Sequence, residues 1–137
     1  MKKILISIKP EYASKIYDGE KTVELRKRIG KDFQRGCKLY IYSSSPVKML
    51  TGEAEIGEIF CASPEQIKKQ LFAVAGITHA AFDEYFKGSP KGYAIFLKNV
   101  REYEKKIPLP VLRAKGITPP QSFSYLNEEH ASLMWGY

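Results

Sequence analysis

The stretch Gly19-Glu20-Lys21-Thr22-Val23-Glu24-Leu25-Arg26 decides the fold, because a predicted helix passes there into a predicted strand. Gly19 can adopt the left-handed conformation that ends many helices. Apolar and charged residues then alternate, which predicts a strand with one buried face and one charged face. Glu24 and Arg26 are neighbours on the charged face, and Lys21 brings an ammonium group to the start of the strand. Three charged groups therefore meet at one helix-to-strand junction.

The segments around this junction predict an α+β chain. Alternating isoleucines indicate a strand over residues 3–9, and Pro10 opens the helix that ends at Gly19. The pattern further predicts strands over 21–28, 38–42, 48–60, 91–100 and 102–109, helices over 64–76 and 78–88, irregular chain from 110, and a last helix from about Asn127. Because the middle strands follow one another without long crossovers, we expect residues 1–137 to form one domain, a mixed and mostly antiparallel β-barrel with flanking helices.

The charge of the chain favours an anionic partner. The formal net charge is +7, and residues 21–38 hold seven basic but only two acidic side chains. Such a concentrated basic segment raises the local concentration of phosphate-bearing ligands. The alternative explanation is a solvated surface that keeps the protein in solution.

Composition also argues against several classes of function. The cysteines form no CxxC pair, and the two histidines lie in different predicted helices, so we expect neither a metal nor another cofactor. No apolar run approaches the ~20 residues needed to cross a bilayer, so we expect no membrane association. The basic start leads into a short apolar segment that resembles a strand more than a signal peptide, which favours a cytoplasmic protein.

The spacing Gly19-x-Lys21-x-x-Glu24-x-Arg26 matches the G-x-K-x-x-E-x-R signature of ASCH domains in full. The segment Ser7-Ile8-Lys9-Pro10-Glu11-Tyr12-Ala13 is similar to the first strand and helix of that family, and Lys91-Gly92-Tyr93-Ala94-Ile95 resembles its penultimate strand. The resemblance covers about residues 3–100. It implies a PUA-like β-barrel with a cleft beside the motif, in which Lys21, Glu24 and Arg26 would bind RNA or a nucleotide-like ligand.

The resemblance implies several possible activities. ASCH domains are usually read as RNA-binding, with roles in RNA modification, translation or transcriptional coactivation, and at least one member is a ribonuclease. Other members are amidohydrolases of acylated cytidine that use a lysine at the position of Lys21 and a nucleophilic threonine three residues later. This chain has Glu24 at the threonine position, and a carboxylate cannot replace an activated hydroxyl without a different mechanism. This departure argues against amidohydrolase activity.

Further polar residues are candidates for the same cleft. Lys9 ends the first strand near the motif, and Arg28 continues the charged face of the motif strand. Ser43, Ser44 and Ser45 end the third strand and offer hydroxyl or N–H groups to a phosphate. The alternative for the serines is an ordinary loop.

Two more groups of side chains have both a functional and a structural interpretation. Tyr40 and Tyr42 alternate with apolar neighbours and are candidates for stacking on a base, with packing inside the barrel as the alternative. A solvated acidic strand face is predicted for Glu53, Glu55 and Glu58. One of these carboxylates is a candidate partner for the basic loop, residues 29–36 of the basic segment.

Three functional hypotheses stay open. In the first, the motif cleft binds RNA or a nucleotide, with an affinity that falls as salt rises. In the second, the protein is a metal-independent hydrolase of a modified nucleoside or RNA, with Lys21 and Glu24 as candidate catalytic groups. In the third, it is a transcriptional regulator that contacts DNA or a protein partner, although neither middle helix is especially basic. The sequence leaves the identity of the ligand and the oligomeric state open.

Overall fold

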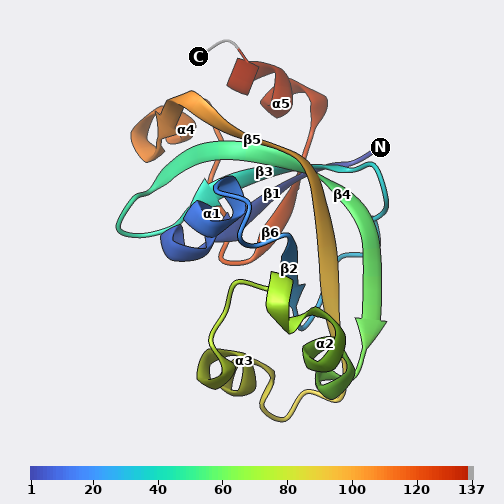
Figure 1. Ribbon diagram of the computed structural model, residues 1–137. Helices are drawn as coiled ribbons and strands as arrows, with labels where there is room; N and C mark the ends of the chain where they lie inside the picture. The colour runs from blue at the N-terminus through green and yellow to red at the C-terminus, as the bar shows by residue number, and fades with distance from the viewer. Residues whose placement is uncertain (136–137) are drawn as a thin grey trace.

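One curled six-stranded sheet organises residues 1–135, which the computed structural model describes (Figure 1). Its elements are β1 (Lys3–Ile8), α1 (Pro10–Tyr17), β2 (Val23–Arg26), β3 (Lys38–Ser43), β4 (Met49–Ala62), α2 (Pro64–Leu71), the 3-10 turn η1 (Phe72–Val74), α3 (His79–Phe86), β5 (Gly92–Pro108), α4 (Leu109–Ala114), β6 (Phe123–Leu126) and α5 (Glu128–Trp135). The strand order is β2-β5-β4-β3-β1-β6, and every neighbouring pair is antiparallel except β1 with β3. This arrangement confirms the predicted α+β fold with a mixed, mostly antiparallel, barrel-like sheet.

Two parts of the chain differ from the prediction. The sequence indicated two strands with a break near residue 101, but β5 runs unbroken from Gly92 to Pro108. Its middle is exposed and charged, so apolar alternation disappears there, while pairing with β4 keeps the chain extended. The segment from residue 110, predicted as irregular, contains most of α4 and all of β6. Pro110 lies in the first turn of α4, where its missing N–H removes no helical bond, and β6 is held by pairing with β1.

Both faces of the sheet are covered, and this decides between the two interpretations of Tyr40 and Tyr42. The sequence left open whether these side chains stack on a base or pack inside the barrel. In the structure both side chains are buried in an apolar cluster with Leu5, Leu50 and Leu112. Because α4 packs against this side of the sheet, alternate residues of β3 face one of two cores instead of core and solvent. The structure therefore supports packing, not base stacking, for these two residues.

The helices are short and begin where the sequence indicates. The Ser63 hydroxyl accepts a hydrogen bond from the Gln66 N–H at the start of α2, and the Thr78 hydroxyl accepts one from the Ala81 N–H at the start of α3. Gly19, with a φ of 86°, lets the chain turn from α1 towards β2. No helix within residues 1–135 has the length and apolar composition needed to cross a membrane.

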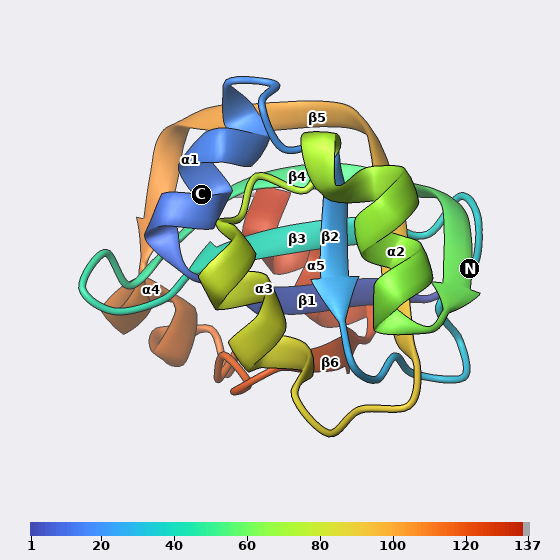
Figure 2. The ribbon, with the colours of Figure 1, turned by 60° about the horizontal axis from the view of Figure 1, so that its bottom comes forward.

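The edge strand β2 is surrounded by the helices that shape the site. Figure 2 shows α2 on one side of β2, with α1 and α3 on the other. β2 is the last strand at one end of the sheet and pairs with β5, from Val23 opposite Phe96 to Arg26 opposite Tyr93. Since β6 is the last strand at the other end, the curled sheet is joined across its open side by side chains rather than by a backbone ladder.

Candidate functional site

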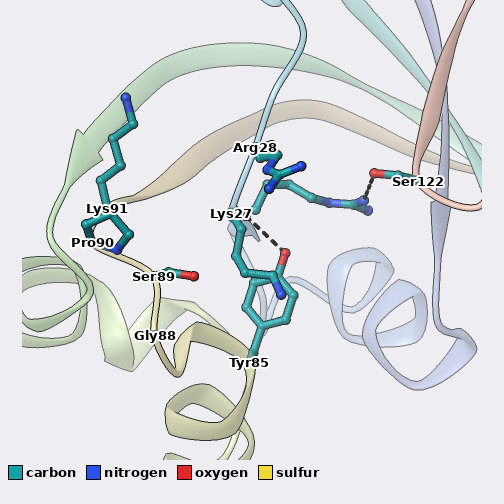
Figure 3. A pocket seen from close by; sticks show the side chains of 9 residues that line it. Lys27, Arg28, Tyr85, Gly88, Ser89, Pro90, Lys91 and Ser122 are labelled. Atoms are coloured by element: carbon teal, nitrogen blue, oxygen red, sulfur yellow. Dashed lines mark hydrogen bonds between the residues drawn. The ribbon is translucent and has the colours of Figure 1, made fainter.

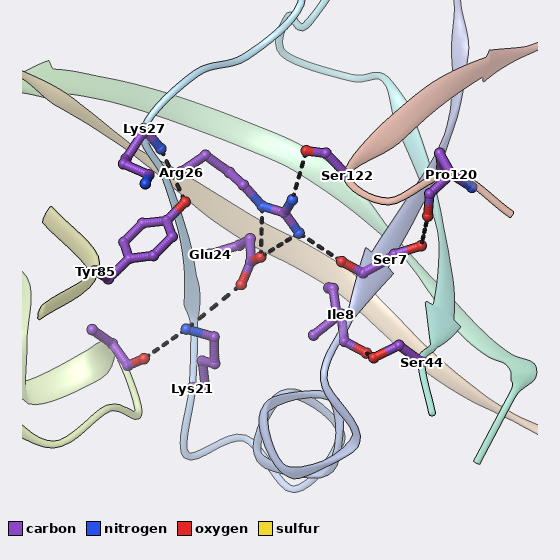
Figure 4. A network of polar contacts seen from close by, with 11 residues as sticks. Ser7, Ile8, Lys21, Glu24, Arg26, Lys27, Ser44, Tyr85, Pro120 and Ser122 are labelled. Carbon is purple, nitrogen blue, oxygen red and sulfur yellow. Dashed lines mark hydrogen bonds and ion pairs between the residues drawn. The ribbon is translucent and has the colours of Figure 1, made fainter. Parts of the chain in front are cut away.

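The three charged groups of the motif meet at the start of β2 (Figure 4). Lys21 Nζ lies 3.6 Å from Glu24 Oε1. Glu24 Oε2 accepts a hydrogen bond from Arg26 Nε at 2.9 Å and lies 2.8 Å from Arg26 Nη2. The three side chains are only 3%, 8% and 12% exposed, so water screens these contacts weakly. The structure thus brings together the groups that the sequence places at this junction.

Lys21 is held by the backbone and by an aromatic ring. Its Nζ donates to the Ala75 carbonyl at 2.7 Å and stands 5.3 Å from the centre of the Tyr12 ring. The next residue, Gly76, makes this close approach possible, because a Cβ at its position would lie 2.7 Å from Lys21 Cβ. Its φ of 60° also favours glycine. The turn after η1 is therefore built around the lysine side chain.

Burial also changes the acid–base character of Lys21. Desolvation lowers the pKa of its ammonium group below the ordinary value of 10.5, and the charges of Arg26 and Lys15 lower it further. The Glu24 carboxylate opposes this shift without cancelling it. Lys21 therefore loses its proton at a lower pH than a surface lysine, which is relevant to any base chemistry in this site.

The Arg26 guanidinium bridges the open side of the sheet. Its Nη2 donates to the Ser7 carbonyl on β1 at 2.9 Å, and its Nη1 donates to Ser122 Oγ, just before β6, at 3.1 Å. With the contacts to Glu24, all of its nitrogens are engaged. Of the two roles that the motif spacing allows, a fixed guanidinium or a free donor fork, the geometry supports the first.

A cleft of about 590 Å³ opens beside these groups. β1, α1, β2, α3 and the segments after β3 and before β6 contribute to its walls. The predicted binding residues that line it are Lys9, Lys21, Glu24, Arg26 and Ser44. The volume falls within the range of roughly 300–1,000 Å³ typical of small-ligand sites.

The other predicted binding residues lie elsewhere. Ser43 is buried, with its hydroxyl 2.8 Å from Thr51 Oγ1, and Ser45 is exposed in the turn after β3. Neither is among the residues that line the cleft. Arg28 lines a second hollow next to it. Of the serine run, the structure therefore brings only Ser44 to the motif.

Two tyrosines that were not among the predicted site residues form aromatic walls of the cleft. Tyr12 on α1 lies beside Lys21, and Tyr85 on α3 lies across the cleft, where its hydroxyl accepts a hydrogen bond from the Lys27 N–H at 3.1 Å. Burial raises the pKa of both phenols, with a further contribution from Glu24. Both tyrosines are therefore neutral at physiological pH and present a ring face with a polar tip. The sequence does not show that these tyrosines line the cleft, because their position depends on how α1 and α3 pack around β2.

A second hollow of about 630 Å³ continues from the cleft along β2 (Figure 3). It is lined by Arg26, Lys27, Arg28, Tyr85, Gly88, Ser89, Pro90, Lys91 and Ser122. Arg26 and Tyr85 belong to both hollows. Residues 88–90 connect α3 to β5, and this loop becomes part of the site because it folds back beside the end of β2.

The predicted acidic face is not a uniform solvated surface. Glu53 is buried and forms ion pairs with Lys38 and Arg101, each at 3.0 Å. Glu58 is exposed and pairs with Arg35 of the basic loop, as the sequence had suggested for one of these carboxylates. Within residues 1–135, no group of three or more His, Cys, Asp or Glu side chains is placed to hold a metal ion.

Comparison with known proteins relates this geometry to one family. Residues 1–114 match the family described as a domain of unknown function, DUF365. A protein of Zymomonas mobilis subsp. mobilis, named ASCH domain-containing ribonuclease, is 30% identical over 137 residues, covering 97% of this chain and 90% of that protein. The crystal structure of ASCH from Zymomonas mobilis is similar with a TM-score of 0.91 and 28% identity, over 98% of this chain and 94% of that chain.

A more distant similarity concerns the fold alone. Human THYN1, crystallised in complex with DNA containing 5-methylcytosine, has a TM-score of 0.66 and 14% identity. The alignment covers 99% of this chain and 96% of the human chain. The same architecture therefore persists at low sequence identity.

Proposed function

The chain belongs to the ASCH family and has its PUA-like fold, and from this premise we propose that it binds RNA or an RNA-derived nucleotide in the cleft beside Lys21, Glu24 and Arg26. The observation that carries the proposal is the cleft itself, about 590 Å³ in volume, in which cationic, acceptor and aromatic groups converge. These are the three kinds of group that bind phosphates, base edges and base faces.

The lining groups have distinct roles in this proposal. Glu24 Oε1 has only a loose contact with Lys21, at 3.6 Å, and so retains acceptor capacity for an exocyclic amine of a base. Tyr12 and Tyr85 offer ring faces for stacking. Arg26 acts as a positioning residue, because its contacts fix the Glu24 carboxylate.

Exposed cations provide the phosphate contacts. Lys9 is exposed at the mouth of the cleft, directly after β1, and the net charge of +7 favours association with a polyanion. Binding by these groups releases counterions, so affinity must decrease with salt. A place in RNA metabolism, or in the regulation of transcription or translation, is consistent with such a module.

The proposal is tested by fluorescence anisotropy with a labelled single-stranded RNA at several salt concentrations. We expect salt-sensitive binding that weakens in Lys9→Ala, with the slope of log affinity against log salt reduced by about 0.7 for one lost phosphate contact. Lys69→Ala, an exposed substitution in α2 that removes the same charge, is the matched control and should retain the slope. The absence of salt-sensitive binding to single-stranded or structured RNA would disprove the proposal.

A second candidate function is hydrolysis of RNA or of a modified nucleoside without a metal. It is favoured by the 30% identical relative named a ribonuclease and by the burial of Lys21, which lowers the pKa of its ammonium group. In this reaction Lys21 would act as a base and Glu24 would orient it. We expect RNA cleavage in the presence of EDTA that is lost in Lys21→Arg, since a guanidinium does not deprotonate. Intact RNA after prolonged incubation with the native protein would exclude this candidate for that substrate.

A further inference from the structure

We propose that the hollow along residues 88–91 is a backbone-phosphate subsite that continues the motif cleft, so that the ligand is a single-stranded oligonucleotide and not a free nucleoside. The inference rests on the proposed function and specifies the class of ligand. It depends on three properties of the hollow: it is continuous with the cleft, it is lined by cations without a carboxylate, and its hydroxyl groups can donate to phosphate oxygens.

Continuity follows from two shared residues. Arg26 and Tyr85 line both hollows, one from β2 and the other from α3. Tyr85 is held at this boundary, because its hydroxyl accepts from the Lys27 N–H at 3.1 Å while Lys27 Nζ lies 5.0 Å from the ring centre. A base stacked on the Tyr85 ring therefore has the second hollow directly beside it, where the next phosphate of a strand would lie (Figure 3).

The charged residues that line the hollow are all cationic. Its lining includes Arg26, Lys27, Arg28 and Lys91 and contains no acidic residue. Of these, Lys27, Arg28 and Lys91 form no ion pair with any carboxylate that the structure describes, unlike Lys68 with Asp83 elsewhere on the surface. Cations gathered without counter-charges repel one another, and an anion between them relieves that repulsion.

Hydroxyl groups complete the subsite. Figure 3 shows the Ser89 hydroxyl directed into the hollow from the loop after α3. The loop is fixed in this shape, because Gly88 has a φ of 77° and the Ser89 N–H donates to the Phe86 carbonyl at 2.9 Å. Ser122 lies on the opposite side and accepts from Arg26. Its own hydroxyl hydrogen, like that of Ser89, can donate to a phosphate oxygen.

The sizes of the two hollows argue for a polymer. Each has the volume of a small-ligand site, about 590 and about 630 Å³. A mononucleotide can occupy the cleft, but it leaves the second hollow without an anion. A strand that spans both makes additional phosphate contacts, each of which increases affinity at low salt.

The experiment compares a labelled single-stranded RNA of about six nucleotides, within the range known for single-strand-binding folds, with competing nucleoside monophosphates. The test variant is the double substitution Arg28→Ala/Lys91→Ala. The matched control is Lys69→Ala/Lys98→Ala, which removes two exposed cations outside both hollows. Circular dichroism and thermal unfolding establish that both variants are folded.

We expect the native protein to bind the oligonucleotide more tightly than any monophosphate. In the test variant this preference should decrease, and the salt slope should fall by about 1.4, for two phosphate contacts of a single strand. Between ~50 and ~200 mM salt, that change reduces the salt-induced loss of affinity by about sevenfold. The control should keep both the preference and the slope.

The outcomes separate this inference from the proposed function. If monophosphate and oligonucleotide bind the native protein equally, or if test and control variants behave alike, the phosphate subsite is wrong while the motif cleft stands. If neither ligand binds, the proposed function fails and the inference fails with it.

Discussion

The Nη2 of Arg26 donates to the carbonyl of Ser7 at 2.9 Å, and this bond connects β2, the last strand at one end of the sheet, to β1 near the other end. The bond spans the open side of the curled sheet, where the sheet itself provides no backbone ladder. The motif arginine therefore has a structural role as well as a place in the cleft. It also holds Glu24 in the orientation in which the carboxylate faces the cleft.

Replacement of this arginine should destabilise the protein. In Arg26→Met the Ser7 carbonyl and the Glu24 carboxylate lose a donor in a largely buried environment. Removing one partner of a buried ion pair costs about 3–5 kcal/mol, and we expect a value near the lower limit because Lys21 still faces Glu24. Urea unfolding measures the loss. Arg35→Met, which breaks the exposed pair with Glu58, should change stability little. Equal effects of the two substitutions would show that Arg26 does not join the strands.

Gly76 should tolerate alanine less well than another glycine with the same backbone conformation. Gly76 and Gly88 both have positive φ, at 60° and 77°, so alanine is strained at either position. At Gly76 a Cβ would also lie 2.7 Å from Lys21 Cβ, whereas at Gly88 it would meet nothing within 4 Å. We expect Gly76→Ala to lose more unfolding free energy than Gly88→Ala in thermal or urea unfolding. Equal losses would indicate that Lys21 moves aside without cost.

The local part of the site could be predicted from the sequence. Glu24 and Arg26 are two residues apart, so strand alternation places their side chains on one face, and Lys21 lies close to them in sequence, just before β2. A glycine inside a strand, such as Gly57, is likewise typical of a bulge, and the register of β4 against β5 does shift between Ile56 and Ile59. These features depend on spacing along one segment of chain.

The remaining part of the site depends on contacts between distant segments. Ser122 reaches Arg26 from 96 residues away, through a segment that showed no periodic pattern. Tyr85 has the helical spacing of a core residue, and only the packing of α3 beside β2 turns one side of its ring to the cleft. Tyr40 is the reverse case. Alternation places its side chain on the outer face of β3, but alternation cannot reveal that this face is covered by a second apolar core.

The stability of the protein should decrease in acid partly because of Glu53. Burial alone would raise the pKa of this carboxyl, but hydrogen bonds from Tyr103 and Lys38 and the charges of Lys38 and Arg101 lower it below its ordinary value of 4.5. The stabilisation is therefore fully present above about pH 4.5 and is lost as the pH falls through the lower pKa of the folded state. Chemical unfolding at several pH values should show a shallower acid dependence in Glu53→Gln. An unchanged acid dependence in this variant would assign the effect to other carboxyls.

Tyr85 should contribute a stacking surface for a base. Loss of one base–aromatic stack costs about 1–3 kcal/mol, so Tyr85→Ala should weaken RNA binding by roughly 5- to 140-fold. Tyr85→Phe keeps the ring and its edge contact with Phe86, at 4.9 Å between centroids, and should retain most of the affinity. Anisotropy titrations of both variants distinguish the ring from the hydroxyl. Similar losses in both would point to the hydrogen bond with Lys27 instead of stacking.

The pH dependence of Lys21 distinguishes the two candidate functions. Burial lowers the pKa of its ammonium group below 10.5, so the cation disappears at a lower pH than that of a surface lysine. If Lys21 binds a phosphate or base as a cation, RNA affinity should fall as the pH rises through this lowered pKa, and Lys21→Arg should remove that fall because arginine stays charged. If Lys21 acts as a base, the rate of RNA cleavage should instead rise over the same range and vanish in Lys21→Arg. Binding and cleavage measured in parallel from neutral to alkaline pH therefore assign the role of the lysine, and a pH-independent result in both assays would remove it from the site's chemistry.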